Sequence, residues 1–191
     1  MKTRHLLAVL VEDQPGVLNR VVSLMRRRSF NIESITVGKS EQPHVSRMTI
    51  VVDGEEDEVE QVGKQLYKLM EVLKVTDLTD MNCVAHELAM IKVAAKPQHR
   101  SEILQIAQIY GARVVDASPS TLMLEATGPE EQVDGLLAML RGFGIREQVR
   151  TGPIALTRGS GTVAVKASQT QGQRVEQAAA AVGNGTKVAM S

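Results

Sequence analysis

The stretch VEDQPGVLNRV, residues 11–21, decides the fold because it joins a continuous apolar run to an amphipathic one. The run before it, Leu6 to Val11, predicts a strand that is buried in a sheet. The residues after it place apolar side chains along one helix face: Leu18, Val21, Val22 and Met25. At the junction we expect Asp13 to cap the helix and Pro15 to lie in its first turn. Gly16 has no side chain, so we expect the backbone N–H groups of Gly16, Val17 and Leu18 to be accessible to a small anion.

The first half of the chain predicts four further elements after this helix. Two strands, Ile32–Val37 and the alternating residues Met48, Ile50 and Val52, are separated by a loop at Ser40–His44. A second helix starts at the acidic run Glu55–Glu58 and carries apolar side chains on one face: Val59, Val62, Leu66 and Leu69. A final strand spans Val72–Leu78. The predicted order is β-α-β-β-α-β.

The second half repeats this order. Its expected strands are Leu88–Ala95, Arg113–Ala117, Leu122–Ala126 and Ile145–Leu156. One helix ends at Gly111, and the other starts at Pro129 and ends at Gly142. The chain is therefore predicted to be an α+β protein of two ferredoxin-like βαββαβ domains, residues 1–80 and 84–158. Residues 159–191, which are rich in Gly, Ser, Gln and Ala, are expected to form a flexible tail.

Composition and charge restrict the partners. The 191 residues hold 22 Lys and Arg against 22 Asp and Glu, so no net field attracts nucleic acid or an anionic membrane. No apolar run approaches the roughly 20 residues needed to span a bilayer, and no secretory signal is expected. The single Cys83 gives no disulfide framework and suits a reducing compartment. We therefore expect a cytoplasmic protein that binds neither nucleic acid nor membrane.

Catalytic and metal-binding motifs do not occur in the sequence. The four histidines have no metal-ligand spacing, and Cys83 has no second cysteine beside it. The predicted central strands carry no aromatic side chain on which a base could stack, which argues against an RNA-recognition module. No nucleophile motif occurs, and Gly159-Ser160-Gly161 lacks the lysine of a phosphate loop. We expect no catalytic residue and no metal site in this chain.

Gly16 distinguishes the first predicted domain from the second. The equivalent junction in the second domain is Lys96–Arg100, which contains no glycine. A purely structural requirement of the turn should act on both copies, so the difference favours a site that is special to the first domain. A tight glycine turn without a ligand is the alternative.

Three short runs in the first domain form a set: EDQPGVL at 12–18, FNIESITV at 30–37 and SRMTI at 46–50. Together they resemble the ACT domain of the acetolactate synthase (acetohydroxyacid synthase) small subunit, and the resemblance extends over about residues 1–158. It implies that the N-terminal domain is an ACT domain and that the chain is a non-catalytic regulatory subunit. In that family the small subunit binds a large catalytic subunit, raises its activity and makes it sensitive to valine.

The resemblance also implies a reaction, cofactors and an effector site. The complex joins two pyruvates, or pyruvate and 2-oxobutyrate, in branched-chain amino-acid biosynthesis, and the partner catalytic subunit carries thiamine diphosphate, Mg and FAD. Two ACT domains pair side by side in a homodimer, with valine or a related amino acid at their interface. Carried over to this chain, the effector-binding residues lie in the first loop and helix of one copy and the second strand of the other: Asp13, Gly16, Val17 and Leu18, with Asn31 and Ile32.

A second class of function stays open, namely an amino-acid-sensing ACT protein that regulates a different enzyme or transcription. A transcription regulator is disfavoured because no helix-turn-helix segment remains outside the two predicted domains.

Overall fold

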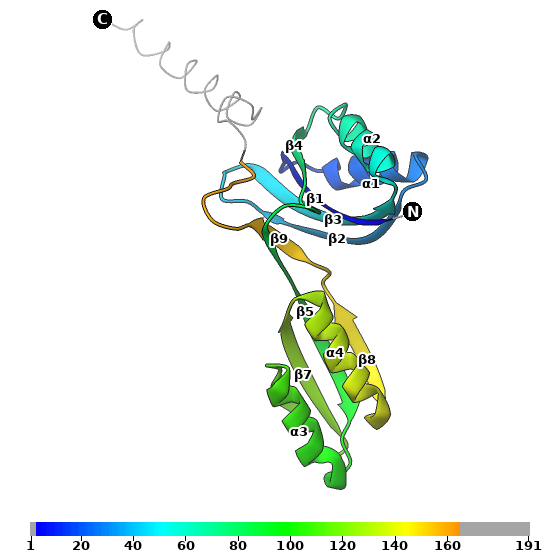
Figure 1. The fold of residues 1–191 in the computed structure, drawn as a ribbon, viewed down its shortest axis with the longest axis vertical. Coiled ribbons are helices and arrows are strands. Elements are labelled where there is room, and N and C mark those ends of the chain that lie inside the picture. Colours follow the sequence, from blue (N-terminus) through cyan, green and yellow to red (C-terminus); the bar gives the residue numbers. More distant parts are fainter. Residues whose placement is uncertain (1–2, 165–191) are drawn as a thin grey trace, which may run out of the picture. The chain divides into compact units, whose positions relative to one another are not determined.

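The computed structural model describes residues 3–164, which form two compact units. The first unit consists of the residues up to Cys83 together with those that follow Leu156, and the second consists of Val84–Leu156. The second unit is therefore inserted into the sequence of the first. Each unit contains an antiparallel sheet with two helices on one face (Figure 1), which confirms the predicted α+β class.

The first unit follows the predicted order. Its elements are β1 (Thr3–Glu12), α1 (Val17–Arg27), β2 (Asn31–Lys39), β3 (Val45–Gly54), α2 (Glu56–Leu66) and β4 (Val72–Asp77). The strands lie in the order β2-β3-β1-β4, so β2 and β4 are the edges of the sheet. A capping box between Glu55 and Glu58 begins α2. The helix ends at Leu66, so Leu69 lies after it and not on the predicted helix face, although it still packs against the core.

The core of the first unit lies between the sheet and its two helices. Leu7 and Val9 of β1 share this core with Val21 of α1, and none of the three is more than 1% exposed. Ala8 and Leu10 alternate with them and point to the face of the sheet that carries no helix, yet they are equally buried. Burial on both faces explains why β1 is a continuous apolar run rather than an alternating one.

The second unit repeats the topology. Its elements are β5 (Cys83–Ala94), η1 (Pro97–His99), α3 (Arg100–Ile109), β6 (Arg113–Ala117), β7 (Thr121–Gly128), α4 (Glu130–Leu140), η2 (Arg141–Phe143), β8 (Ile145–Arg150) and β9 (Ile154–Thr157). The strand order is β6-β7-β5-β8, and β9 also pairs with β5. The single strand predicted over Ile145–Leu156 is wrong. The chain breaks between β8 and β9, where Gly152 has a φ of +75° and Pro153 has no N–H to donate.

Close helix packing defines the core of the second unit. Ile91 of β5, Ile103 of α3 and Leu136 of α4 are completely buried in one cluster. Gly135 of α4 lies directly against Tyr110, because a Cβ added at this glycine would be 2.7 Å from the tyrosine ring. The absence of a side chain at Gly135 therefore lets the tyrosine pack against α4.

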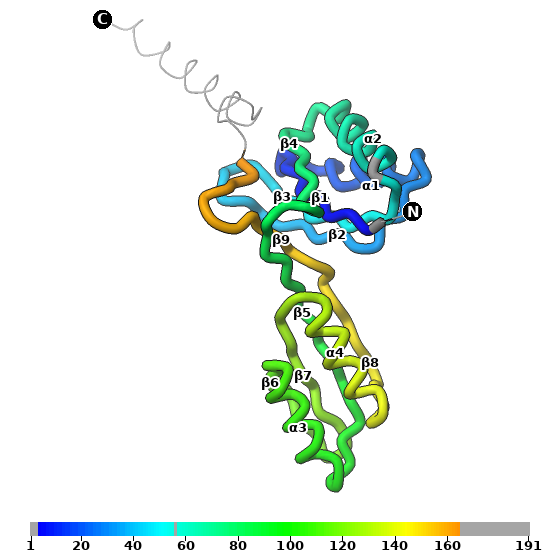
Figure 2. Tube along the Cα trace, in the orientation of Figure 1, coloured from blue at the N-terminus to red at the C-terminus, as the bar shows by residue number. Residues whose placement is uncertain are grey.

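The chain returns to the first unit after β9 (the orange segment in Figure 2). Val163 is 7% exposed there, and the Lys74 ammonium donates a hydrogen bond of 3.2 Å to the Ala164 carbonyl. The tail was predicted to begin at residue 159, and its first six residues thus lie with the first unit. Residues 165–191, which make up the rest of that predicted tail, lie outside the described residues.

Candidate functional site

The junction between β1 and α1 differs from its prediction at two residues. The N-cap of α1 is Gly16, with φ +85° and ψ −7°, and no side chain caps the helix. Asp13 lies three residues before this cap and Pro15 directly before it. The predicted Asp13 cap and the predicted place of Pro15 in the first helical turn are therefore wrong. The reason is that Gly16 turns the chain through a left-handed conformation, which other residues adopt only with strain.

Hydrogen bonds hold this turn in place. The Asp13 N–H donates to the His44 carbonyl at 2.8 Å, which joins the turn to the loop between β2 and β3. The Gln14 N–H donates to the Glu12 carbonyl at 3.0 Å, and the Gln14 side-chain amide donates to the buried Glu12 carboxylate at 2.9 Å. The turn is thus fixed on both sides, and a ligand that bound it would not have to order it first.

Backbone donors lie at the start of α1. The N–H groups of Gly16, Leu18 and Asn19 have no acceptor among the described residues, whereas Val17 donates to the Gln14 carbonyl at a long 3.4 Å. They lie at the positive end of the helix dipole. A Cβ added at Gly16 would meet no atom of a described residue within 4 Å, so this part of the structure leaves the space beside the glycine open. This arrangement can bind a small carboxylate.

Four of the six predicted effector-binding residues come together at this turn. Asp13 and Gly16 are exposed, and Leu18 is 44% exposed, so all three are accessible to a ligand. Val17 is only 3% exposed because its side chain packs into the core. Leu18, rather than Val17, is therefore the apolar side chain that a ligand at this turn could contact.

Asn31 and Ile32 lie at the opposite end of the same sheet. Glu12, next to the turn, pairs with Val45 at the start of β3, whereas Asn31 pairs with Asp53 near its end. The two positions are eight residue steps apart along β3, which corresponds to about 26 Å at the usual rise of a strand. Asn31 is exposed, and Ile32 packs against the core. A single chain therefore cannot use both groups of residues in one small-molecule site.

The two edge strands of the first sheet, β4 and β2, differ in how their outer backbone groups are hydrogen-bonded. On β4, the Tyr67 hydroxyl accepts a hydrogen bond from the Val75 N–H at 3.0 Å and donates one to the Val75 carbonyl at 3.2 Å. This side chain occupies backbone groups that could otherwise pair with another strand. No sequence pattern predicts this contact, which depends on the spatial position of β4. Among residues 3–164, the other edge strand, β2, pairs only with β3.

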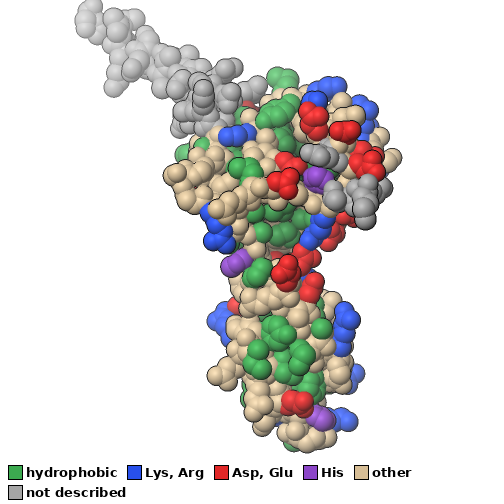
Figure 3. Space-filling view, viewed as in Figure 1, with side chains coloured by type: hydrophobic (Ala, Val, Ile, Leu, Met, Phe, Trp, Pro, Cys, Tyr) green, Lys and Arg blue, Asp and Glu red, His purple; other side chains and the backbone are tan. Residues whose placement is uncertain are grey.

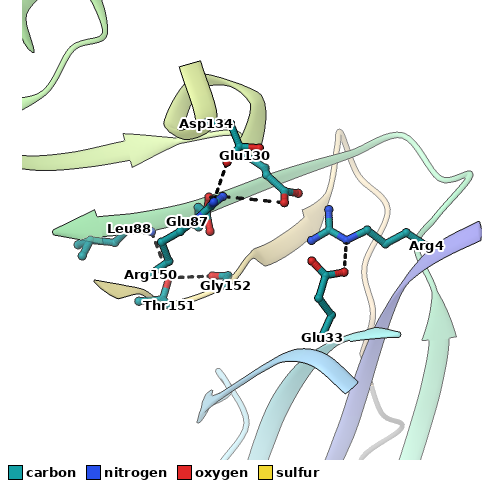
Figure 4. Close-up of polar contacts among 9 residues, drawn as sticks. All are labelled: Arg4, Glu33, Glu87, Leu88, Glu130, Asp134, Arg150, Thr151 and Gly152. Atoms are coloured by element: carbon teal, nitrogen blue, oxygen red, sulfur yellow. Dashed lines mark hydrogen bonds and ion pairs between the residues drawn. The ribbon is translucent and has the colours of Figure 1, made fainter. Parts of the chain in front are cut away.

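A charged cluster in the second unit is structural. The Arg150 guanidinium donates hydrogen bonds to Glu87 and, at 2.6 Å, to Asp134, and it lies 3.9 Å from Glu130 (Figure 4). The hydrogen bond with Glu87, which is only 4% exposed, raises the pKa of Arg150 although partial burial opposes it. The cation and the carboxylates satisfy one another. We therefore assign this cluster to stability.

The described chain offers little other chemistry. Within residues 3–164, no group of three or more His, Cys, Asp or Glu side chains is arranged to hold a metal ion. No helix in the part of the chain that the structure describes is long and apolar enough to cross a membrane. On the face drawn in Figure 3, acidic and basic side chains are interspersed. The turn at Gly16 is thus the candidate site that the geometry favours.

The fold and this turn define a protein with an N-terminal ACT domain followed by a second ferredoxin-like domain. Two family models match the chain in that order. Residues 7–74 match the AHAS small subunit-like ACT domain, and residues 86–159 match the small subunit of acetolactate synthase. The chain therefore belongs to the acetolactate synthase small-subunit family, which confirms the resemblance of its motifs.

Individual relatives support this membership. The "Probable acetolactate synthase small subunit" of Methanothermobacter thermautotrophicus is 51% identical over 160 residues, which cover 83% of this chain and 95% of that protein. The acetolactate synthase small subunit of Mycobacterium leprae is 49% identical over 155 residues, covering 81% and 92% of the two chains. The crystal structure of the Thermotoga maritima small subunit matches with a TM-score of 0.77 at 39% identity, covering 83% of this chain and 99% of that one.

Proposed function

We propose that this chain activates the thiamine-diphosphate-dependent catalytic subunit of acetolactate synthase and makes it sensitive to feedback inhibition by valine or a related branched-chain amino acid. The observation that carries the proposal is the set of unpaired backbone donors at Gly16, in a chain of the small-subunit family. The partner, rather than this chain, would carry thiamine diphosphate, Mg and FAD.

The chemistry of an amino acid suits this turn. Its carboxylate can accept hydrogen bonds from the N–H groups at the start of α1. Its ammonium can donate to an oxygen of Asp13 or of an asparagine, and its apolar side chain can pack on Leu18. Two charge-assisted hydrogen bonds are worth about 1.5–3 kcal/mol each. A buried isopropyl group adds about 1.5–3 kcal/mol. Association costs at least about 4 kcal/mol, which leaves at most about 5 kcal/mol, so we expect a weak affinity of roughly millimolar order.

A second copy of the chain completes the proposed site. Because the Tyr67 hydroxyl occupies the Val75 backbone groups on β4, we expect β2 to be the edge that pairs with a second copy. Lys39, at the end of β2, pairs with Ser46 and therefore lies at the same end of the sheet as the Gly16 turn. If two β2 strands pair antiparallel about a two-fold axis, Asn31 of the second copy comes to this end. The homodimer thus brings together the two groups that one chain holds apart.

Reconstitution tests the proposed function. The purified chain is expected to form no acetolactate alone, to stimulate the catalytic subunit when the two are mixed, and to make the mixture sensitive to valine. Sedimentation of the chain at micromolar concentration should show a dimer. If the chain binds valine but does not change the activity of the catalytic subunit, the alternative of an ACT protein that regulates another target is supported instead.

A further inference from the structure

Residues 158–164, here called the return strap, follow the second unit in sequence but belong to the first. The strap begins in a turn, because Gly159 has a φ of +69° and the Thr157 hydroxyl donates a 2.5 Å hydrogen bond to the Gly161 carbonyl. Its other end is anchored, since Val163 is buried and the Ala164 carbonyl accepts a hydrogen bond from Lys74. A segment of Gly, Ser and Thr composition is therefore fixed at both ends.

The strap is anchored on the face of the first sheet that carries no helix. Lys74 pairs with Leu10 across β4 and β1, so both side chains point to the same face. Leu10 is 1% exposed and its neighbour on that face, Ala8, is completely buried. The bond from Lys74 to Ala164 is charge-assisted and partly buried, which makes it stronger than an exposed hydrogen bond.

Arg158 holds the start of the strap. Its N–H donates to the Asn82 carbonyl at 2.8 Å, and its guanidinium Nε donates to the Cys83 carbonyl at 3.2 Å. Asn82 directly precedes β5 and Cys83 is its first residue, whereas Arg158 directly follows β9. One residue therefore joins the segment by which the chain leaves the first unit to the segment by which it returns.

We propose that the return strap, held at Arg158, covers the helix-free face of the first sheet and couples the valine response of the complex to the second unit. The strap is covalently continuous with β9, so in this proposal a displacement of β9 is transmitted through Arg158 to the anchors at Val163 and Ala164. The coupling to the valine response rests on the proposed function. The coverage of the sheet face by the strap does not depend on that function, and it can be tested on the free protein.

Two truncated chains test whether the strap covers the sheet. A chain that ends at Ala164 keeps the strap, and a chain that ends at Gly159 removes its anchors. Amide hydrogen exchange of β4 should be about tenfold faster in the shorter chain than in the longer one, because the shorter chain loses a hydrogen bond from a charged donor. Equal exchange in the two chains would overturn the covering role. The substitution Lys74→Met removes only the donor and should give the same direction of change in a full-length chain.

The substitution Arg158→Ala tests the coupling in the reconstituted complex. Its matched control is Arg146→Ala, because Arg146 is exposed on β8 and its guanidinium makes no hydrogen bond or ion pair with a described residue. Both variants should stimulate the catalytic subunit. Arg158→Ala should shift the valine concentration for half-inhibition at least about threefold, as expected for the loss of one weak hydrogen bond. Identical curves for the two variants would overturn the coupling. A wild-type complex that valine does not inhibit would overturn the proposed function and the coupling together, while hydrogen exchange would still decide the covering role.

Discussion

The two units place a buried ionisable side chain and its partner at equivalent positions of their sheets. In the first unit, His5 of β1 lies 3.3 Å from Asp77 of β4. In the second, Glu87 of β5 bonds to Arg150 of β8. The positions are equivalent, because Asp77 pairs with Leu7, two residues after His5, and Arg150 pairs with Ala89, two residues after Glu87. In the first unit the acidic residue of the pair, Asp77, lies on the edge strand β4. In the second unit the acidic residue, Glu87, lies on the central strand β5.

The units differ at the junction from the first strand to the first helix. The first unit uses a left-handed Gly16, whereas the second enters α3 through the 3-10 turn Pro97–His99 with no residue of positive φ. A difference between copies is not by itself evidence of a site. Gly135 also occurs in only one unit, and Tyr110 explains it. No packed neighbour among the described residues requires Gly16, but its left-handed φ of +85° does, so a ligand there is favoured by the open backbone donors rather than by this contrast.

The largest expected effect is that of Gly16→Asp. The new carboxylate lies where the effector carboxylate would bind, so two charge-assisted hydrogen bonds are lost and the valine concentration for half-inhibition should rise at least about hundredfold. Stimulation of the catalytic subunit should remain. The matched control is Gly111→Asp, because Gly111 has a φ of +67° in the second unit and lies at no proposed site. Equal loss of inhibition in both variants would attribute the effect to backbone strain.

The next largest effect is expected from removing the Arg150 guanidinium in the second unit. Arg150→Met leaves Glu87 buried without its partner and should lower the free energy of unfolding by about 3–5 kcal/mol in urea denaturation. His5→Leu, at the equivalent position of the first unit, should cost about 1 kcal/mol or less because Asp77 is half exposed to water. Comparable losses would mean that the two pairs are equivalent in energy as well as position.

Asn31→Ala should have a smaller effect on regulation. It removes one polar partner of the amino-acid head group and should weaken valine binding by about 1–3 kcal/mol, which is about tenfold or more. Asn19→Ala is the control, because Asn19 is an exposed residue of α1 whose backbone donor is unaffected. Calorimetric titration with valine measures both, and unchanged affinity in Asn31→Ala would remove β2 from the site.

The smallest effects come from glycines inside two helices. Gly135→Ala overpacks against Tyr110 and should cost about 1–2 kcal/mol of stability. Gly63→Ala in α2 places its Cβ 3.9 Å from Val75, an ordinary contact, and should stabilise by about 0.5–1 kcal/mol. Thermal unfolding of the two variants should therefore shift in opposite directions. Shifts in the same direction would show that helix propensity, rather than Tyr110, decides the effect.

The sequence predicted the elements well where periodicity is strong. It identified Gly16 as exceptional but assigned the cap to Asp13, because a polar residue before a helix signals a side-chain cap whether or not a left-handed glycine replaces it. The sequence contains the Gly152-Pro153 pair that breaks the strand, but the apolar residues after this pair favoured the prediction of one continuous strand. The edge contact of Tyr67 and the anchoring of Val163 could not be predicted, since both depend on which strand lies beside them.

The separation of Asn31 from the Gly16 turn also required the structure, because it follows from strand register. From this separation we predict that each effector site takes its turn from one chain and its Asn31 from the other. A mixed dimer can test this prediction.

The direct measurement is valine binding to a dimer of one Gly16→Asp chain and one Asn31→Ala chain, isolated by two different affinity tags. If each site is shared, one site of this mixed dimer carries both defects and the other carries neither. Calorimetry should then show half the wild-type number of sites, each with wild-type affinity. If both groups came from the same chain, every site would carry one defect, and the absence of any wild-type site would contradict the account.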